Sequence, residues 1–260
     1  ADDGCDTRQA AAAARDLSAK DVRLVVGHFC AGAAQAAAVL YGDAGILMIS
    51  PAATLPALTD QGGWNVFRTT VRDDAQADLA AARLGADQKL VVVADGLPSS
   101  KALVARLQAA GKAAAIVPSA QADAALVDAV NAAGATVVYL AAGPAEAARV
   151  LGVLRGAGVA LPLWGSDNLL ADEFLARLPA GENQLFATFP ADPQSRLVDG
   201  GVKAHFTASG ADGAVLPAYA AVQAFVAAAK ATSVNDGKAM ATWLHAGNSV
   251  ATAIGTLSFD

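Results

Sequence analysis

Charged and aromatic side chains are scarce in this chain of 260 residues, where they make up 16% and 5% of the sequence. The net charge is −6, and lysine and arginine are scattered singly, so no basic stripe is present that could neutralise nucleic-acid phosphates. Hydrophobic residues make up 55%, with alanine the most frequent among them. This composition is typical of a well-packed globular protein, with enough residues for one large domain or two modest ones.

An uninterrupted apolar stretch long enough to cross a membrane is also missing. Three uncharged runs approach that length, but each is rich in alanine and broken by glycine, proline, histidine or polar residues: Leu24–Gly42, Gly213–Ala229 and Ala239–Phe259. No transmembrane helix is therefore expected. The chain has only two cysteines, Cys5 and Cys30, which either pair or remain as two buried thiols; their number leaves both readings open.

The common enzyme motifs are absent as well. There is no G-x-G-x-x-G after a strand, no G-x-x-x-x-G-K-[ST] and no G-x-S-x-G. The three histidines, His28, His205 and His245, are far apart in the sequence. His28 and Cys30 could form half of a metal site, but a second pair of ligands is lacking, so no metal is expected. An α/β enzyme that uses His28 as a base is kept as a less favoured alternative.

What the chain does contain is a βαβ unit near its start. Val22–Val26 is rich in β-branched residues and predicts a buried parallel strand, Gly27–Gly32 turns the chain, and Ala33–Tyr41 predicts a helix. Ile46–Ile49 predicts a second strand. In such units ligands bind beyond the carboxyl ends of the strands, where helix N-termini present unpaired N–H groups. The chemistry is therefore expected in Gly27–Gly32 and Ser50–Thr54.

Strands and helices alternate along the rest of the chain, which predicts a parallel α/β architecture. Further strands are predicted at Val66–Thr70, Leu90–Ala94, Ala113–Val117, Val137–Leu140 and Leu161–Trp164. Helices are predicted at Thr7–Ser18, Asp73–Leu84, Ser99–Ala110, Asp123–Ala133, Ala145–Gly156, Leu197–Ser209, Ala214–Ala231 and Asp236–Ala246. Leu55–Asn65 is predicted as a loop.

Several short motifs are distinctive. They are Asp2-Asp3-x-Cys5-Asp6, Gly27-His28-x-Cys30, the block from Tyr41 to Thr59 that contains Ile46-Leu47-Met48-Ile49-Ser50-Pro51-x-Ala53-Thr54, Phe67-Arg68-Thr69, Trp164-Gly165-Ser166-Asp167, Tyr219–Ala224 and Ile254-Gly255-x-Leu257-x-Phe259-Asp260. Together they resemble the substrate-binding proteins of branched-chain amino acid ABC transporters, which are type I periplasmic binding proteins. The resemblance covers nearly the whole chain and is weak between Asp95 and Ala102 and around Gly143.

This resemblance implies an α/β, two-lobed fold in which each lobe is a parallel sheet flanked by helices and three strands form the hinge. The first lobe would comprise residues 1–71 and 191–253, and the second residues 72–190 and 254–260, with crossings near Thr70–Asp73, Pro190–Pro193 and Ala253–Gly255. It also implies that elements at both ends of the family's fold lie outside this chain. Because a sheet without its first strand exposes apolar edges, low stability is expected of such a piece.

The resemblance further implies that Cys5 and Cys30 form a disulfide. It would close a loop of roughly 25 residues and stabilise the fold by about 3 kcal/mol in the chain-entropy model. A disulfide requires an oxidising compartment, and the family is periplasmic. Neither cofactor nor metal is implied, and the expected partners are a small ligand and the permease of an ABC importer, with the protein itself a monomer.

The function implied is capture of an amino acid, branched-chain or related, in the cleft between two lobes, without catalysis. A free amino acid needs anion donors beside cation acceptors. Helix N-terminal N–H groups and Thr54 suit its carboxylate, and the Ala52 carbonyl and the Asp167 carboxylate suit its ammonium. The expected ligand-binding residues are Ala31, Gly32, Ala52, Ala53, Thr54, Ser99, Gly143 and Asp167. Two have a structural alternative, since Thr54 could cap the turn at Pro56 and Asp167 could cap a helix at Leu169–Leu178.

Three departures from the family bear on the ligand. Ala31 stands where a serine commonly binds the carboxylate, Ser99 and Gly143 or their neighbours stand where tyrosines are frequent, and Asp167 replaces a longer glutamate. These changes enlarge the pocket, so a small carboxylate such as an aromatic acid is an alternative ligand. A ligand-sensing receptor domain is an alternative function. Phe29 and Trp164 are expected in the core.

Overall fold

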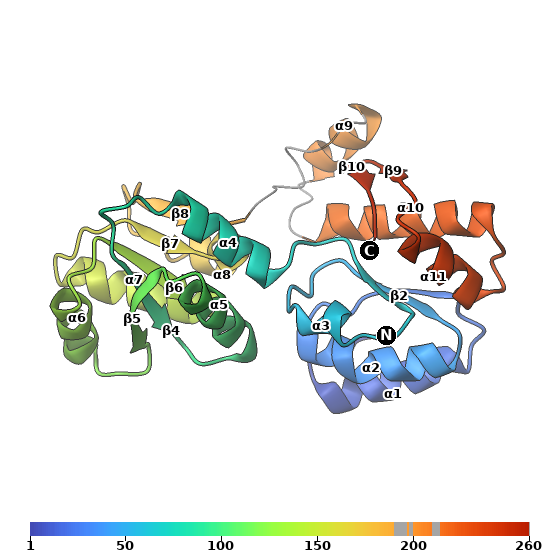
Figure 1. Ribbon diagram of the computed structural model, residues 1–260, viewed down its shortest axis with the longest axis horizontal. Coiled ribbons are helices and arrows are strands. Elements are labelled where there is room, and N and C mark those ends of the chain that lie inside the picture. The colour runs from blue at the N-terminus through green and yellow to red at the C-terminus, as the bar shows by residue number, and fades with distance from the viewer. Residues whose placement is uncertain (190–196, 198–199, 210–213, 260) are drawn as a thin grey trace. The chain divides into compact units, whose positions relative to one another are not determined.

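The computed structural model describes residues 1–189, 197, 200–209 and 214–259. The chain divides into two compact units (Figure 1): unit 1 comprises Ala1–Val71 with Ala191–Asp260, and unit 2 comprises Arg72–Pro190. The structure differs from the predicted division at one end, because residues 254–260 belong to unit 1 rather than to the second lobe. Ile254 packs there with Leu216, and Phe259 packs against Phe67. The predicted crossing at Pro190–Pro193 lies outside the described residues.

Unit 1 is built on a parallel sheet with the strand order β1-β2-β3. Its strands are β1 (Leu24–Val26), β2 (Leu47–Ser50) and β3 (Val66–Arg68), and a separate antiparallel pair is formed by β9 (Val250–Thr252) and β10 (Gly255–Leu257). Its helices are α1 (Thr7–Ser18), α2 (Ala31–Asp43), α3 (Ala57–Asp60), α9 (Gly200–Ser209), α10 (Val215–Ala231) and α11 (Gly237–His245). The predicted strands and helices of this part are thus present, with α3 inside the predicted loop.

The central strand β2 is buried on both faces, as its continuous apolar run predicts. Leu47 and Ile49 pack with residues of α10 and α11, whereas Met48 points to the opposite face and packs with α1 and α2. On that face the small side chains of Ala14 on α1 and Ala37 on α2 are fully buried. The alanine-rich sequence therefore lets two helices pack closely on one side of a short sheet.

Unit 2 is a five-stranded parallel sheet with the order β5-β4-β6-β7-β8. Its strands are β4 (Leu90–Ala94), β5 (Ala113–Pro118), β6 (Val137–Ala141), β7 (Leu163–Gly165) and β8 (Leu185–Ala187). Its helices are α4 (Asp73–Arg83), α5 (Pro98–Ala109), α6 (Asp123–Ala132), α7 (Pro144–Gly156), the 3-10 turn η1 (Asp167–Leu170) and α8 (Asp172–Leu175). The chain leaves β4 toward one edge and returns to its other side at β6, so the topological switch point lies between these two strands.

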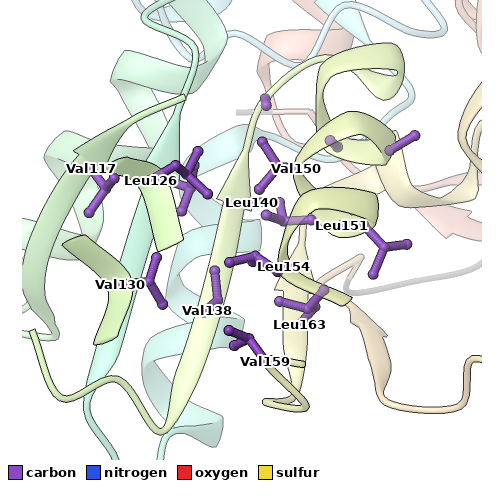
Figure 2. Packing of buried hydrophobic residues seen from close by; sticks show 14 of the residues in the cluster. Val117, Leu126, Val130, Val138, Leu140, Val150, Leu151, Leu154, Val159 and Leu163 are labelled. Carbon is purple, nitrogen blue, oxygen red and sulfur yellow. The ribbon is translucent and has the colours of Figure 1, made fainter. Parts of the chain in front are cut away.

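Two hydrophobic clusters cover the two faces of the unit 2 sheet. On one face, Figure 2 shows Val150, Leu151 and Leu154 of α7 beside Val138 and Leu140 of β6. On the other face, residues of α4 and α5 pack against the alternate side chains of the same strands. The sheet is thus enclosed by helices on both sides, which leaves the loops at the strand ends as the places where polar groups can meet a ligand.

Some sequence expectations do not hold. The helix predicted at Leu169–Leu178 is instead η1 followed by the short α8, and the three-residue strands β8, β9 and β10 were not predicted. Phe29, expected in the core, is 67% exposed in the loop after β1, whereas Trp164 is half-buried against Phe186. Within the described residues, every helix is too short or too polar to span a membrane.

Candidate functional site

In unit 1, two loops follow the neighbouring parallel strands β1 and β2. The first leads into α2, which begins with Ala31 and Gly32, and the second contains Ala52, Ala53 and Thr54. Val26 pairs with Ile49 at the ends of the two strands, so the structure brings these five predicted residues to one edge of the sheet. No side chain caps α2, and its first N–H groups and the helix dipole are directed at this edge.

The loop before α1 is fastened to the loop after β1 by the disulfide between Cys5 and Cys30, whose Cα atoms are 5.4 Å apart. Cys30 is also the N-cap residue of α2, and its carbonyl accepts a hydrogen bond from the N–H of Ala34 at 2.9 Å. The predicted pairing is therefore present, and it holds the start of the helix whose N–H groups face the candidate site.

His28 adds a second link between the same two loops. It is 7% exposed, its Nδ1 contacts the Asp3 carboxylate, and its Nε2 lies 3.1 Å from the Tyr41 hydroxyl. Burial, helped by the charge of Asp3, raises the pKa of Tyr41 to about 12, so the phenol stays protonated and can donate to Nε2. Both ring nitrogens of His28 are thus engaged within the fold.

The contact with His28 has a consequence for acid stability. Burial by itself would raise the pKa of Asp3, but hydrogen bonds from His28 and from the Cys5 N–H outweigh it and hold this pKa below its usual range. Asp3 therefore stabilises the fold at neutral pH, and this stabilisation is lost as the pH falls through the lowered pKa.

We expect Asp3→Asn to lower the free energy of unfolding at pH 7 by about 1 to 2 kcal/mol, because a partly buried charge-assisted hydrogen bond is removed. The difference from the wild type should shrink below about pH 4, where the wild-type carboxyl also becomes protonated. Denaturant unfolding across this pH range measures it. The control is Asp2→Asn in the same exposed loop; an equal loss in both variants would contradict the role of His28.

The second loop of unit 1 is held by two side chains that end neighbouring strands. Ser50 ends β2 and Arg68 ends β3, and the two are register partners. The Ser50 hydroxyl donates to the His28 carbonyl at 2.8 Å and accepts from the Ala53 N–H at 3.0 Å. Arg68 donates to the Ala53 carbonyl at 2.9 Å and to the Leu55 carbonyl at 2.8 Å. Thr54 thus lies in a loop whose backbone is fastened on both sides.

In unit 2 the predicted Asp167 follows β7 and begins η1. It is not the cap of that turn, since Ser166 is the N-cap residue and accepts from the Asn168 N–H. The fully buried Gln76 of α4 forms two hydrogen bonds with Asp167. Its Oε1 accepts from the Asp167 N–H at 2.8 Å, and its Nε2 donates to the carboxylate at 3.1 Å. The same Nε2 lies 3.3 Å from the buried Asp73 carboxylate. Burial raises the pKa of Asp167.

The other two predicted residues of unit 2 lie at helix starts. Ser99 is in the first turn of α5, and Gly143 is the N-cap residue of α7. The Gly143 N–H donates to the Asp95 carboxylate at 2.8 Å, and the other oxygen of Asp95 accepts from the Leu97 N–H at 2.9 Å. Asp95 therefore bridges the switch point between β4 and β6, and it places a negative charge where a helix N-terminus would otherwise attract a carboxylate.

Comparisons with known proteins identify the family of the chain. The family model described as "Periplasmic binding protein" matches residues 1–260. The Leu/Ile/Val-binding protein homolog 1 of Brucella melitensis is 31% identical over 288 residues, which cover all of this chain and 73% of that protein. The chain belongs to the periplasmic binding protein family. The Leu/Ile/Val-binding protein of Escherichia coli is 45% identical over 80 residues, which cover 31% of this chain and 22% of that protein.

Solved structures of periplasmic binding proteins share the fold. A substrate-binding protein of an ABC transporter from Desulfitobacterium hafniense, in complex with Leu, matches with a TM-score of 0.80 at 24% identity, over all of this chain and 80% of that one. A solute-binding protein from R. palustris, in complex with benzoate, also matches with a TM-score of 0.80, at 19% identity, over all of this chain and 77% of that one. The chain thus has the two-lobed type I fold of this family. Its membership of the periplasmic binding protein family makes it a solute-binding protein.

Several polar residues of this periplasmic binding protein were not singled out by sequence reasoning. Ser50 and Arg68 stood in recognised motifs, and their signal is position: Ser50 directly follows the strand predicted at Ile46–Ile49, and Arg68 lies within the strand predicted at Val66–Thr70. Asp95 follows a buried strand and precedes a glycine, which is a comparable signal. Gln76 had none, because it lies between two alanines near the start of a helix and meets Asp167, 91 residues further along the chain, only in the folded protein. Among the described residues, no cluster of three or more potential metal ligands is found.

Proposed function

We propose that this chain binds an α-amino acid, branched-chain or related, in the periplasm and delivers it to the permease of an ABC importer. The observation that carries the proposal is the difference between the two units. The candidate edge of unit 1 is lined by hydrogen-bond donors at the start of α2 and around Thr54, whereas the corresponding edge of unit 2 carries the carboxylates of Asp167 and Asp95. The naming of the Brucella and Escherichia relatives as Leu/Ile/Val-binding supports it.

Unit 1 would bind the carboxylate of the amino acid. The N–H groups of Ala31 and Gly32 lie in the first turn of α2, where the helix dipole attracts an anion, and Thr54 offers an N–H and a hydroxyl. Ala31 has no hydroxyl to add to these donors. Its backbone N–H is retained, so the carboxylate would be held mainly by main-chain groups, with Thr54 as the side-chain donor.

The ammonium would be bound by acceptors. Ala52 offers its carbonyl, and Asp167 offers a charged oxygen whose position is set by Gln76. Ser99, at the start of α5, has a small side chain and Gly143, at the start of α7, has none, so both would leave room for the aliphatic part of the ligand. No catalysis is proposed, because His28, the histidine best placed for it in the sequence, has both ring nitrogens occupied by Asp3 and Tyr41. We propose that the protein acts as a monomer.

Thermal unfolding with and without candidate ligands tests this function. L-leucine, L-isoleucine and L-valine are compared with benzoate and 4-hydroxybenzoate on the oxidised protein, and hits are confirmed by calorimetric titration. A ligand at a hundred times its Kd should stabilise the native state by about 2.7 kcal/mol, which raises Tm by several degrees. D-leucine is the control for the geometry of the carboxylate and ammonium.

A shift with an L-amino acid that is recovered unchanged by mass spectrometry supports the proposal. A shift with the benzoates alone would contradict the amino-acid assignment while leaving a carboxylate-binding function in place. A sharp unfolding transition that no amino acid or small acid moves would contradict the proposed function altogether.

A further inference from the structure

We infer that Ser50 and Arg68 are positioning residues for the ligand: they orient two successive peptide units so that the Ala52 carbonyl and the Thr54 N–H face the bound amino acid. This inference rests on the proposed function and adds residues that do not themselves touch the ligand. It starts from the observation that the register pair Ser50 and Arg68 binds both polar backbone groups of Ala53, which is only 2% exposed.

The first peptide unit joins Ala52 to Ala53 and is trans. In a trans peptide the C=O and N–H point in opposite directions. Because the Ala53 N–H donates to the buried Ser50 hydroxyl, the Ala52 carbonyl is turned away from Ser50. The hydroxyl is itself oriented, since its proton is donated to the His28 carbonyl at 2.8 Å. Ser50 therefore determines the direction of the proposed ammonium acceptor.

The second peptide unit joins Ala53 to Thr54 and is also trans. Its carbonyl accepts from Nη1 of Arg68 at 2.9 Å, so its N–H, which belongs to Thr54, points the opposite way. A guanidinium on the carbonyl also polarises the peptide and strengthens its N–H as a donor. Arg68 therefore orients and strengthens the proposed carboxylate donor, while its Nη2 holds the next carbonyl, that of Leu55, at 2.8 Å.

A further contact fixes Arg68 at the end of β3. Its Nη2 lies 2.9 Å from the hydroxyl of Thr59 in α3, so one planar guanidinium contacts the segment from Ala53 to Thr59 at both ends. A lysine ammonium is a compact donor without this fork and cannot reach all of these acceptors at once. Replacement by lysine thus keeps the positive charge but cannot form all of the hydrogen bonds to Ala53, Leu55 and Thr59 together.

The test uses the oxidised protein and the tightest ligand among L-leucine, L-isoleucine and L-valine, with Kd from calorimetric titration and Tm recorded for every variant. Ser50→Ala and Arg68→Lys should each weaken the binding of an L-amino acid by about tenfold, which corresponds to about 1.4 kcal/mol. Kd is measured well below Tm, where every variant is folded.

Matched controls separate positioning from stability. Ser119→Ala removes another buried hydroxyl, one that is bonded to Glu146 in unit 2. Arg155→Lys disturbs another guanidinium that holds backbone carbonyls, those of Val159 and Leu161. Both controls should lower Tm and leave Kd unchanged. Ser50→Thr keeps the hydroxyl but adds a methyl group at a fully buried position, so it should lower Tm while largely restoring Kd.

The outcomes are distinct. Weaker binding in Ser50→Ala and Arg68→Lys, with unchanged Kd in both controls, supports the inference. Unchanged Kd in Ser50→Ala and Arg68→Lys would overturn it and leave the proposed function intact, and so would an equal loss of affinity in the controls. A wild-type protein that binds none of the three amino acids would overturn the proposed function and this inference with it.

Discussion

Asp167→Asn is expected to weaken the binding of an L-amino acid by about a hundredfold, the largest effect on affinity that we predict for a single substitution. Asparagine keeps the size of the side chain and the backbone contact with Gln76 but removes the charge that would pair with the ligand ammonium. Loss of one partner of a desolvated, hydrogen-bonded charge pair costs about 2 to 5 kcal/mol. Calorimetric titration of the variant and the wild type at pH 7 measures the effect.

The pH dependence of binding provides a second readout for Asp167. Burial raises the pKa of this carboxyl in the free protein, and the groups facing it are the Gln76 amide, the Ser166 hydroxyl and, through Gln76, the Asp73 carboxylate. An ammonium pairs with the ionised form, so binding below the raised pKa must first remove the proton. Affinity should therefore rise with pH through this pKa and level off above it.

The Asp167→Asn variant should show no such rise. Asp172→Asn, at an exposed position in the first turn of α8, is the control and should bind like the wild type at every pH. Equal affinity of Asp167→Asn and the wild type at pH 7 would refute the proposed ammonium contact. Such a result would favour a ligand without an ammonium group.

The largest effect on stability is expected from removing the disulfide. With Cys5 and Cys30 separated by 25 residues, the chain-entropy model gives a stabilisation of about 3.5 kcal/mol. The double variant Cys5→Ser with Cys30→Ser should therefore lose about this much free energy of unfolding, and its Tm should fall by roughly 10 °C. The contact between Asp3 and His28 still joins the two loops, so the variant should remain folded at low temperature.

Denaturant unfolding of the wild type with and without a reducing agent measures the same quantity independently. The double variant is the control, because the reducing agent should not affect it. Ligand affinity should also fall in the reduced protein, since Cys30 is the N-cap residue of α2 and the helix start would loosen. An unchanged free energy of unfolding after full reduction would contradict the stabilising role.

Much of the architecture could be predicted because its elements carry strong local patterns. The buried strands β2, β4 and β6 are continuous apolar runs, and the helices between them are rich in alanine and end near glycines. The elements that were missed or misplaced lack such patterns. Strands β8, β9 and β10 have three residues each, which is too short for the alternation typical of a strand to be recognised. The helix expected at Leu169–Leu178 is interrupted at Ala171, between η1 and α8.

For the candidate site, the sequence could place residues at strand ends but could not predict their partners. Thr54 and Asp167 follow strands, and that position, together with the family resemblance, made them candidates. Gln76 and Asp167, which are hydrogen-bonded, lie 91 positions apart in the sequence. Asp95 and Gly143, also hydrogen-bonded, lie 48 positions apart. Such contacts depend on how helices pack on the sheet, which no local pattern encodes.

Sequence alone thus determined the fold class, the family and the strand ends where a ligand is to be sought, because hydrophobic periodicity and short motifs are local properties of a chain. Tertiary structure decided which groups at those ends remain available. In the folded chain both ring nitrogens of His28 contact other side chains, and Phe29 is exposed. Ser50 and Arg68 hydrogen-bond to the N–H and the carbonyl of Ala53. The physical reason is that hydrogen-bond partners and burial are set by residues distant in sequence, which meet only when the helices close over the sheets.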